Sequence, residues 1–574
     1  MKLVIRESAG TYLTGDTSTL SPLLQRIFSA RQIYDDSELA FSLKQLLPIR
    51  SLGNIEAAST LLAETIANQQ KILIIGDFDA DGATATAVAV RALRIMGHQN
   101  VHYLVPNRFE YGYGLTPEIV VEAARFSPDL IITVDNGISS ISGVATAKEA
   151  GYKVLVTDHH LPGSELPEAD VIVNPNLVDN GFASKNLAGV GVIFYVMLAL
   201  KKRLSEQGYF SKHAITPPNL LSLLDLVALG TIADVVPLDK NNRILVAQGL
   251  QRIRAQQACA GVLALFQIAG KNSQRAVTSD IGFACGPRLN AAGRLDDMSM
   301  GIELLLCDNP QQALNIAAKL DHLNKERRAI EDNMKVEALH ELEHLDSLND
   351  SNIPPIICLY NETWHQGVVG ILASRIKEKY NRPTIIFAPG ENGEIKGSAR
   401  SIKGLHIRDI LDEVATQNKD LLSKFGGHAM AAGLSFMACD FENFTRAITK
   451  VVIKHSNKDT FREIQHTDGV LQPEEFSLET AEALRYAAPW GQHFPEPQFH
   501  GDFVIMQKRI LKDAHIKLML RPKDDTKLSI DAITFNADLA AWPEIGESVS
   551  LLYHLDVNEF SGSLTPQMMI SALL

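Results

Sequence analysis

The stretch "VLVTDHHLPG" at residues 154–163 joins an apolar run to one acid and two adjacent histidines. Its β-branched first half is typical of a buried strand, and Asp158, His159 and His160 stand where that strand would end. Two earlier runs, "KILIIG" (71–76) and "DLIITV" (129–134), have the same apolar character. Helical patterns such as "ATATAVAVRALRIMG" lie between the runs, so the sequence predicts βαβ units and a parallel sheet.

Acidic residues follow each of these predicted strands. The first run is followed by "DFDADG", which holds Asp77, Asp79 and Asp81, and the second by Asp135. In open α/β sheets the carboxyl ends of the strands line the ligand crevice, so one edge would collect these acids together with the DHH triplet. Asp234 in "GTIADVV" also follows an apolar stretch and could join them.

So many carboxylates cannot crowd together uncompensated, because like charges at close range raise their pKa values and destabilise the fold. Divalent cations resolve this conflict, and oxygen ligands with one or two imidazoles suit Mn²⁺ or Mg²⁺. A carboxylate that bridges two ions would make a two-metal site for phosphoryl hydrolysis. Taken singly, each piece has an ordinary alternative: a solvated or calcium-type loop, a surface or core histidine pair, or an aspartate that caps a helix.

Size and composition set wider bounds on the protein. A chain of 574 residues is too long for one core and predicts two to four domains. The net charge of -13 argues against a general nucleic-acid coat but not against a nucleic-acid enzyme with a local basic channel. The five scattered cysteines indicate neither a zinc ribbon nor a disulfide framework. No apolar run or leader pattern indicates a membrane or secreted protein, so we expect a cytoplasmic one.

The pattern along the chain predicts several parts. Residues 1–70 form a helical extension, with helices near 20–48 and 54–69, and residues 71–305 form the catalytic α/β lobe. Residues 306–350 hold one long connecting helix over 309–345, although a core helix of a single domain is the alternative. A second α/β lobe covers 351–455, and about five short strands in 463–574 indicate a small oligonucleotide-binding barrel or, alternatively, a β-sandwich.

One candidate phosphate site lies in the second lobe. "FGGHAMAAG" places Gly426 and Gly427 before what reads as a helix of small residues, and His428 follows them. Glycines let backbone N–H groups approach a phosphate, and a helix N-terminus favours an anion. A simple turn before a helix is the alternative.

Other candidate DNA contacts are basic or aromatic residues in small-residue surroundings. Arginines bind phosphates in a bidentate manner and aromatic rings stack on bases, whereas surface ion pairing and core packing are the alternatives. The candidates are Arg288, Asn290 and Arg294 in "CGPRLNAAGR"; Arg108, Tyr111 and Tyr113 in "RFEYGYG"; and Arg375 and Arg400. In the last region they are Lys508, Arg509, Lys512, Lys517 and Arg521, interleaved with Phe499, Phe503 and Phe535.

The order of these motifs resembles a known family. "DFDADG", "VDNG", "TDHH" and "GTIADVVPL" are similar to the four motifs of the DHH phosphoesterases, and "GPRLNAAGRL" and "KFGGHAMAAG" narrow the resemblance to bacterial exonucleases specific for single-stranded DNA. The likeness covers nearly the whole chain and implies a two-lobed DHH/DHHA1 core with a C-terminal OB-type barrel.

The resemblance also implies roles for individual residues. The metal ligands would be Asp79, Asp81, Asp135, His159 and Asp234, and Asp135 would bridge the two ions. His160 would contact the scissile phosphate, and Asp158 would fix the strand end and orient the histidines. Asp77 would be a ligand or a supporting acid, and Asp225 a helix residue or a supporting acid.

By the same resemblance, the expected activity is 5′-to-3′ hydrolysis of single-stranded DNA to 5′-mononucleotides, with two Mn²⁺ or Mg²⁺ ions, in DNA repair and recombination. A helicase and a single-strand-binding protein are expected partners, and the chain would act as a monomer. Two rivals stay open. One is a small-substrate phosphoesterase of the same superfamily. The other is a non-catalytic replication scaffold, against which the retained acids and histidines argue.

Overall fold

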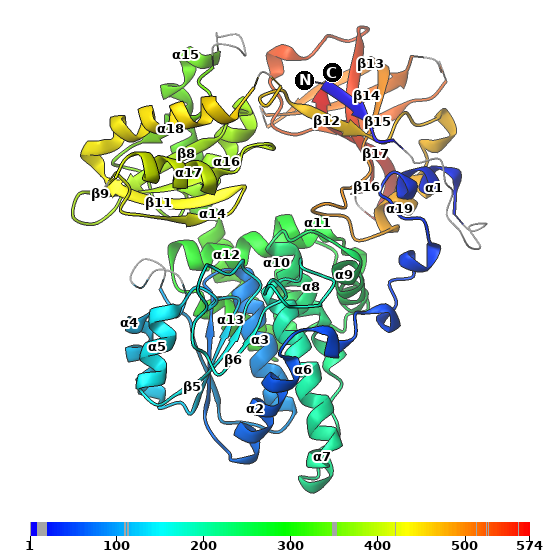
Figure 1. The fold of residues 1–574 in the computed structure, drawn as a ribbon. Helices are drawn as coiled ribbons and strands as arrows, with labels where there is room; N and C mark the ends of the chain where they lie inside the picture. The colour runs from blue at the N-terminus through cyan, green and yellow to red at the C-terminus, as the bar shows by residue number, and fades with distance from the viewer. Residues whose placement is uncertain are drawn as a thin grey trace. The chain divides into compact units, whose positions relative to one another are not determined.

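The computed structural model describes residues 2–7, 20–107, 111, 114–346, 353–419, 421–457, 459–512, 514–523, 525, 527–560 and 562–574 (Figure 1). The chain divides into two compact units. We call residues 5–321 with 466–574 the main unit, and residues 1–4 with 322–465 the inserted unit. Each is described by itself.

A five-stranded parallel sheet forms the centre of the first half of the main unit. Its strand order is β3-β2-β4-β5-β6, and every neighbouring pair runs parallel, as the apolar runs predicted. The residues of β2 and β4 are buried throughout, which explains their continuous apolar sequence. The strands are β2 (Ile72–Gly76), β3 (Val101–Leu104), β4 (Leu130–Val134), β5 (Lys153–Thr157) and β6 (Val171–Val173).

Helices cover the sheet and extend beyond it. One layer is formed by α4 (Pro117–Ala123) and α5 (Ile141–Glu149), whose apolar residues share a core with β2, β4 and β5 (Figure 1). α3 (Ala80–Ile95) packs against α6 (Gly189–Glu206) and α8 (Leu224–Ala233). The remaining helices of this part are α7 (Tyr209–Lys212), α9 (Lys240–Arg254), α10 (Ala260–Ile268), α11 (Thr278–Asp280), α12 (Gly286–Leu295) and α13 (Ser299–Leu306).

The N-terminal region is less helical than the sequence predicted. The helix expected near 54–69 is present as α2 (Ile55–Ala67), but the one expected over 20–48 ends early, as α1 (Pro22–Ser29). Short 3₁₀ turns follow it. The side chains of Asp35 and Ser42 accept backbone N–H groups there, which offers the chain a local alternative to a helix.

The predicted long helix is present as α14 (Pro310–Glu341), and α15 (Glu343–Asp346) follows it. The boundary between the two units falls within α14, between Asp321 and His322. Its later turns supply Met334 and Ala338 to the core of the inserted unit. The helix therefore belongs to both units along the chain.

The inserted unit is built on a mixed five-stranded sheet of order β10-β11-β9-β8-β7. β7 and β8 run parallel, and the other neighbouring pairs are antiparallel. Its strands are β7 (Ile357–Tyr360), β8 (Thr384–Pro389), β9 (Glu394–Arg400), β10 (Lys424–Gly427) and β11 (Ala431–Met437). Its further helices are α16 (Val369–Tyr380), α17 (Ile407–Gln417) and α18 (Phe441–His455).

The segment after Gly427 corrects one prediction, because it is the strand β11 and not a helix. β10 and β11 form an antiparallel hairpin, and Gly427 turns the chain with φ +143°. Ala432, Leu434 and Phe436 alternate into the core, which is strand periodicity. Pairing with β9 on the other side of β11 outweighs the helix propensity of the alanines.

The last strands of the main unit close into a barrel of order β13-β14-β15-β17-β16, so the sandwich alternative is excluded. The strands are β13 (Phe499–Leu511), β14 (His515–Pro522), β15 (Ile530–Thr534), β16 (Ser548–Phe560) and β17 (Ser563–Leu573). The helix α19 (Leu478–Tyr486) precedes them, and β12 (Ile464–Thr467) pairs with β1 (Lys2–Ile5). Within the described residues, no helix is long and apolar enough to cross a membrane.

Candidate metal centre

The predicted acids and histidines gather at the carboxyl edge of the parallel sheet. β2, β4 and β5 are parallel neighbours, and the residues that follow them are Asp77, Asp135 and Asp158. Possible ligand atoms come within 4.8 Å of one another in three groups. The groups are Asp77, Asp79 and Asp135; Asp81, His159 and Asp234; and Asp135, His159 and His160. The structure therefore brings together every side chain for which the sequence predicted metal chemistry.

The loop after β2 is shaped by its own carboxylates. Asp79 is the N-cap of α3, and its Oδ1 accepts the backbone N–H groups of Asp81 and Gly82 at 2.9 and 3.0 Å. Asp77 accepts the N–H of Phe78 at 2.7 Å. Capping bonds of this kind fix the loop and leave its carboxylates gathered at the sheet edge.

Asp81 is bound by the N-terminus of α6. Its Oδ2 accepts the N–H of Gly189 at 2.7 Å, and its Oδ1 accepts the N–H of Val190 at 2.9 Å. Burial, together with the charge of Asp79, nevertheless raises the pKa of Asp81 to about 7. The backbone thus holds the carboxylate in place without neutralising the cluster.

Asp135 is a buried member of the centre with an unusual backbone conformation. Its φ is +63°, in the left-handed region that residues with a side chain seldom adopt, and the residue is 1% exposed. Burial raises its pKa well above the ordinary value, and the charges of Asp81 and Asp79 raise it further. A buried acid among like charges is a site where a bound cation would be strongly stabilising.

The two histidines of the triplet have different partners. The Nε2 atom of His159 lies 3.1 Å from Asp135 and 3.5 Å from Asp234. The Nδ1 atom of His160 instead lies 2.8 Å from Asp158, a hydrogen bond that favours the protonated ring. Burial opposes that charge, but the bond and the charge of Asp158 raise the pKa of His160 to about 9.

Asp158 holds the triplet together, as expected. One of its carboxylate oxygens accepts the backbone N–H groups of His159 and His160 at 2.7 and 3.1 Å, and the other accepts that of Ile138 at 2.9 Å. Burial alone would raise the pKa of Asp158, but the hydrogen bond and charge of His160 lower it. This carboxylate fixes the strand end and the orientation of one ring.

The two remaining acids of the sequence analysis, Asp234 and Asp225, have different surroundings. Asp234 ends α8 within the second ligand group, and burial and the charge of Asp81 raise its pKa well above the ordinary value. Asp225, at the start of α8, accepts the N–H of Cys259 at 2.7 Å and belongs to none of the three groups. Among the described residues, then, Asp225 serves to hold the start of α10.

The donor set of the centre fits a hard divalent cation. Its members offer carboxylate oxygens and imidazole nitrogens, which are the ligands that Mg²⁺ and Mn²⁺ take. Burial first, and then the repulsion among these carboxylates, raise the pKa values of Asp81, Asp135 and Asp234. Positive charge between them would relieve that repulsion.

The helix α12 supports the centre in a way that the sequence analysis missed. Asn290 accepts the N–H of Ala80 at 2.8 Å, so its side chain braces the loop after β2. A Cβ at Gly293 would lie 1.8 Å from the carbonyl oxygen of Phe78, so α12 needs glycine there. Arg288, by contrast, is bound to Asp321 at 2.8 Å, and Arg294 is half-buried.

Candidates in the inserted unit have partners within that unit. Arg375 pairs with Glu331 at 3.1 Å, and Arg400 donates to Ser398 at 3.0 Å. Gly426, Gly427 and His428 form the exposed end of the β10–β11 hairpin, where the N–H of His428 donates to Ala431 at 2.9 Å.

Two further candidates, Arg108 and Tyr113, lie outside the described residues. Their neighbour Tyr111 is half-buried and packs against the core of the sheet.

The basic and aromatic residues of the barrel do not form one surface. Phe499 and Phe503 are buried, whereas the ring of Phe535 is 52% exposed. Lys508 bonds to Glu544 at 2.9 Å, and Lys517 lies 3.4 Å from Asp531. Arg509 and Lys512 are exposed, and Arg521 is half-buried. Core packing, which was the alternative to a DNA contact, is therefore correct for Phe499 and Phe503.

The sequence contains a signal for Gly189, a residue of the centre that the sequence analysis did not identify. "LAGVGV" at 187–192 places glycines at the start of a helix, and Gly189 fits closely because a Cβ there would lie 2.5 Å from Asp135. A glycine just inside a helix start indicates close backbone approach to another group. The sequence does not show, however, that Asp135 is the group that Gly189 approaches.

Comparison with protein families agrees with this architecture. The model of the DHH family N-terminal domain matches residues 71–231, that of the DHHA1 domain residues 354–454, and that of the RecJ OB domain residues 467–572. The three matches follow the order of the parallel sheet, the inserted unit and the barrel.

Curated relatives match nearly the whole chain. The single-stranded-DNA-specific exonuclease RecJ of Dickeya dadantii is 51% identical over 97% of this chain and 96% of its own length. The protein of the same name from Escherichia coli is 50% identical over 96% of this chain and 95% of its own length.

Solved structures have the same fold. The crystal structure of RecJ from Thermus thermophilus in complex with Mn²⁺ aligns with 100% of this chain and 79% of that chain, with a TM-score of 0.79 and 28% identity. An exonuclease RecJ bound to manganese aligns with 73% of this chain and 97% of that chain, with a TM-score of 0.59 and 35% identity. The chain therefore belongs to the RecJ family of single-stranded-DNA-specific exonucleases.

Proposed function

We propose that this protein is a divalent-metal-dependent exonuclease that hydrolyses single-stranded DNA from the 5′ end and releases 5′-mononucleotides in DNA repair and recombination. The observation that carries the proposal is the convergence of acids and histidines from three neighbouring strand ends. The specificity for single strands is supported by the names of the relatives, and the metal by the manganese in the solved RecJ structures.

The proposed ligands of two Mn²⁺ or Mg²⁺ ions are Asp79, Asp81, Asp135, His159 and Asp234. Asp135 and His159 each belong to two of the three ligand groups, and Asp135 is the candidate for the bridging ligand because a carboxylate offers two oxygens. Asp77 shares a group with Asp79 and Asp135, which supports a role as a ligand or as a supporting acid. The bound ions would supply positive charge that activates a water and stabilises the leaving oxygen of the sugar.

The chain's own residues would do the remaining work. His160 is bound through Nδ1 to Asp158, so its other ring nitrogen can donate to an oxygen of the scissile phosphate. Asp158 keeps this ring in one orientation, and the N-terminus of α6 keeps Asp81 in place. The catalytic scheme requires no side-chain nucleophile.

The DNA strand would be held by contacts of several kinds. On α12, Arg294 is a proposed phosphate contact. Asn290 would contribute indirectly, because its side chain binds the N–H of Ala80 and braces the loop after β2. Arg400, the Gly426–Gly427 turn and His428 are our proposed phosphate contacts in the inserted unit, with Arg375 as a weaker one because Glu331 and Glu378 already bind it. Arg108 and Tyr113 are proposed on sequence alone, and Arg288 is a weaker proposed contact because Asp321 already binds it.

The proposed substrate also suggests protein partners and a cellular compartment. An exonuclease that takes only single strands needs a helicase to open duplexes and meets strands coated by a single-strand-binding protein, so both are proposed partners. A chromosomal substrate suggests action in the cytoplasm of a bacterium, and we propose that the chain acts there as a monomer.

The direct test is degradation of oligonucleotides labelled at the 5′ or the 3′ end, with Mn²⁺, Mg²⁺ or EDTA. We expect the 5′ label to leave as a mononucleotide, the 3′-labelled strand to shorten progressively, and a blunt duplex to resist. Asp135→Asn should abolish activity, whereas the matched control Asp179→Asn, at an exposed acid of the same region, should not. Cleavage of short dinucleotides alone would instead favour a small-substrate phosphoesterase.

A further inference from the structure

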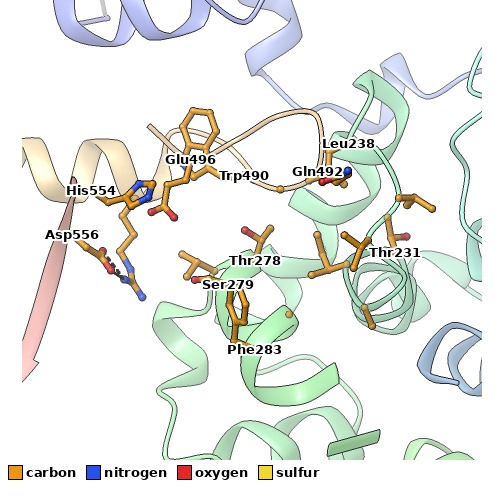
Figure 2. A pocket seen from close by; sticks show the side chains of 18 of the residues that line it. Thr231, Leu238, Thr278, Ser279, Phe283, Trp490, Gln492, Glu496, His554 and Asp556 are labelled. Carbon is orange, nitrogen blue, oxygen red and sulfur yellow. Dashed lines mark hydrogen bonds and ion pairs between the residues drawn. The ribbon is translucent and has the colours of Figure 1, made fainter. Parts of the chain in front are cut away.

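A cavity of about 580 Å³ lies in the main unit. One side is formed by the end of α8 and by the π-helical turn Ile281–Cys285. The other side is formed by the segment 490–496 and by the barrel strand β16. Figure 2 shows Thr278, Ser279 and Phe283 on the first side, with Trp490 and Glu496 across from them.

Two residues of the cavity wall are the chain neighbours of a proposed metal ligand. Ala233 and Val235 line the cavity, and the residue between them is Asp234, a proposed ligand. Consecutive Cα atoms are about 3.8 Å apart, so the wall begins one residue from the centre. The N–H of Leu238 donates to the carbonyl oxygen of Gln492 at 2.8 Å, which ties this loop to the opposite side.

The two sides of the cavity differ in how firmly their aromatic residues are held. Trp490 is 6% exposed and stacks on Phe28 and Phe494, with ring centroids 5.8 and 5.2 Å away. Phe283 is 79% exposed, so most of its ring faces solvent and is available for contact. It stands on a π-helical turn, a feature that occurs frequently at functional sites.

The charges that face the cavity do not favour a phosphate. The lining includes two acids, Glu496 and Asp556, against one arginine, Arg485, which is paired with Asp556 at 2.7 Å. His554 is bound through Nδ1 to the carbonyl oxygen of Pro497 at 2.7 Å. An uncharged ring with hydrogen-bonding edges suits this lining better, because Thr278, Gln492 and Glu496 can pair with such edges.

We propose that this cavity, the base pocket, receives one unpaired nucleobase of the substrate strand, with Phe283 as its stacking face. The inference rests on the proposed function, since the strand must lie across the metal centre. Every base has a π-face, so stacking on Phe283 would not depend on sequence. A paired base cannot enter the pocket without leaving its duplex, so the pocket would contribute to the preference for single strands.

The first test measures the affinity for a 3′-labelled single-stranded oligonucleotide in EDTA by fluorescence anisotropy. We expect Phe283→Ala and Phe283→Leu to weaken binding by about tenfold, because the leucine keeps apolar area but has no ring. Phe283→Tyr should bind like the wild type. The matched control is Phe560→Ala, a ring of similar exposure (74%) in β16 outside the lining. Unchanged unfolding temperatures would exclude a folding defect.

The second test moves a single abasic residue along the oligonucleotide. At one position, the missing base should weaken wild-type binding, and Phe283→Ala should then cost nothing more, since both changes remove the same contact. If Phe283→Ala binds like the wild type, or if its effect is the same with the abasic residue at every position, the inference is wrong. A wild-type protein that fails to degrade single-stranded DNA with Mn²⁺ would instead overturn the proposed function itself.

Discussion

The backbone N–H of Gly189 donates a 2.7 Å hydrogen bond to the carboxylate of Asp81, which lies 108 positions earlier in the chain. This bond places the N-terminus of α6 against the metal centre, where the helix dipole favours negative charge. A Cβ at position 189 would lie 2.5 Å from Oδ1 of Asp135. The missing side chain therefore lets two acids of the centre approach the same helix end.

Substitution of Gly189 by alanine should disturb the centre more than the fold. The added Cβ would push Asp135 away from its neighbours, so we expect the affinity for Mn²⁺ to fall by about 10- to 100-fold, with a matching loss of activity at limiting metal. Isothermal titration with Mn²⁺ measures the first effect. Gly181→Ala is the control, because a Cβ at Gly181 would meet nothing within 4 Å. Equal metal affinity in the two variants would contradict this role.

Asp158→Asn should impair catalysis through His160. The amide keeps the shape of the carboxylate, but it removes the charged acceptor of His160 and turns an N–H donor toward Ile138. We expect kcat to fall by about 10- to 100-fold. Asp170→Asn is the matched control, because Asp170 binds the N–H of Val154 at 2.7 Å near the opposite end of the same strand. An Asp158→Asn enzyme with the turnover of that control would refute the assignment.

Metal removal should make stability fall as pH rises. The pKa of Asp81 is raised to about 7, and those of Asp135 and Asp234 are raised as well, so the metal-free folded state holds protons that the unfolded chain has released. The stabilisation from these acids is fully present below the pKa values that they have in the unfolded chain. It is lost as pH rises through the higher pKa values that they have in the folded state.

In EDTA, we therefore expect a lower unfolding temperature at about pH 8 than at about pH 5.5, and Mn²⁺ should narrow the difference. Thermal unfolding followed by circular dichroism measures it. Asp135→Asn should show a weaker dependence on pH. A metal-free protein that gains stability over this range, with the variant behaving identically, would count against the electrostatic account.

The aromatic residues of the barrel should divide into core and surface by their effect on stability. Phe503 is 2% exposed and Phe535 is 52% exposed. Phe503→Ala should cost about 3–5 kcal/mol through lost burial and a cavity. Phe535→Ala should change the free energy of unfolding by less than about 0.5 kcal/mol. Urea unfolding of both variants decides the point, and similar costs would mean that the burial assignment is wrong.

The sequence alone predicted the features that follow from local patterns. The buried strands before Asp77, Asp135 and Asp158 have short β-branched apolar runs that are typical of a sheet interior, and parallel topology then brings their ends together. The long helix was also predictable, because Pro310 starts it and no glycine interrupts it. These parts of the fold depend on periodicity, which a single sequence records.

Other features depend on contacts between distant residues. The alanines after Gly427 favour a helix by propensity, but pairing with β9 makes them a strand. Asn290 resembles a DNA contact in sequence, whereas the structure uses it to brace Ala80. Arg288 is bound by Asp321, a partner on another helix. No local pattern identifies these partners, so the sequence could name the residue types but not their roles.

The central claim is that the acids and histidines at the sheet edge hold two divalent ions for phosphodiester hydrolysis. Anomalous diffraction from crystals of the full chain grown with Mn²⁺ tests it most directly. The account predicts two manganese peaks among Asp79, Asp81, Asp135, His159 and Asp234, with Asp135 touching both. A map without manganese between these side chains, from crystals of a protein that still degrades single-stranded DNA, would contradict it.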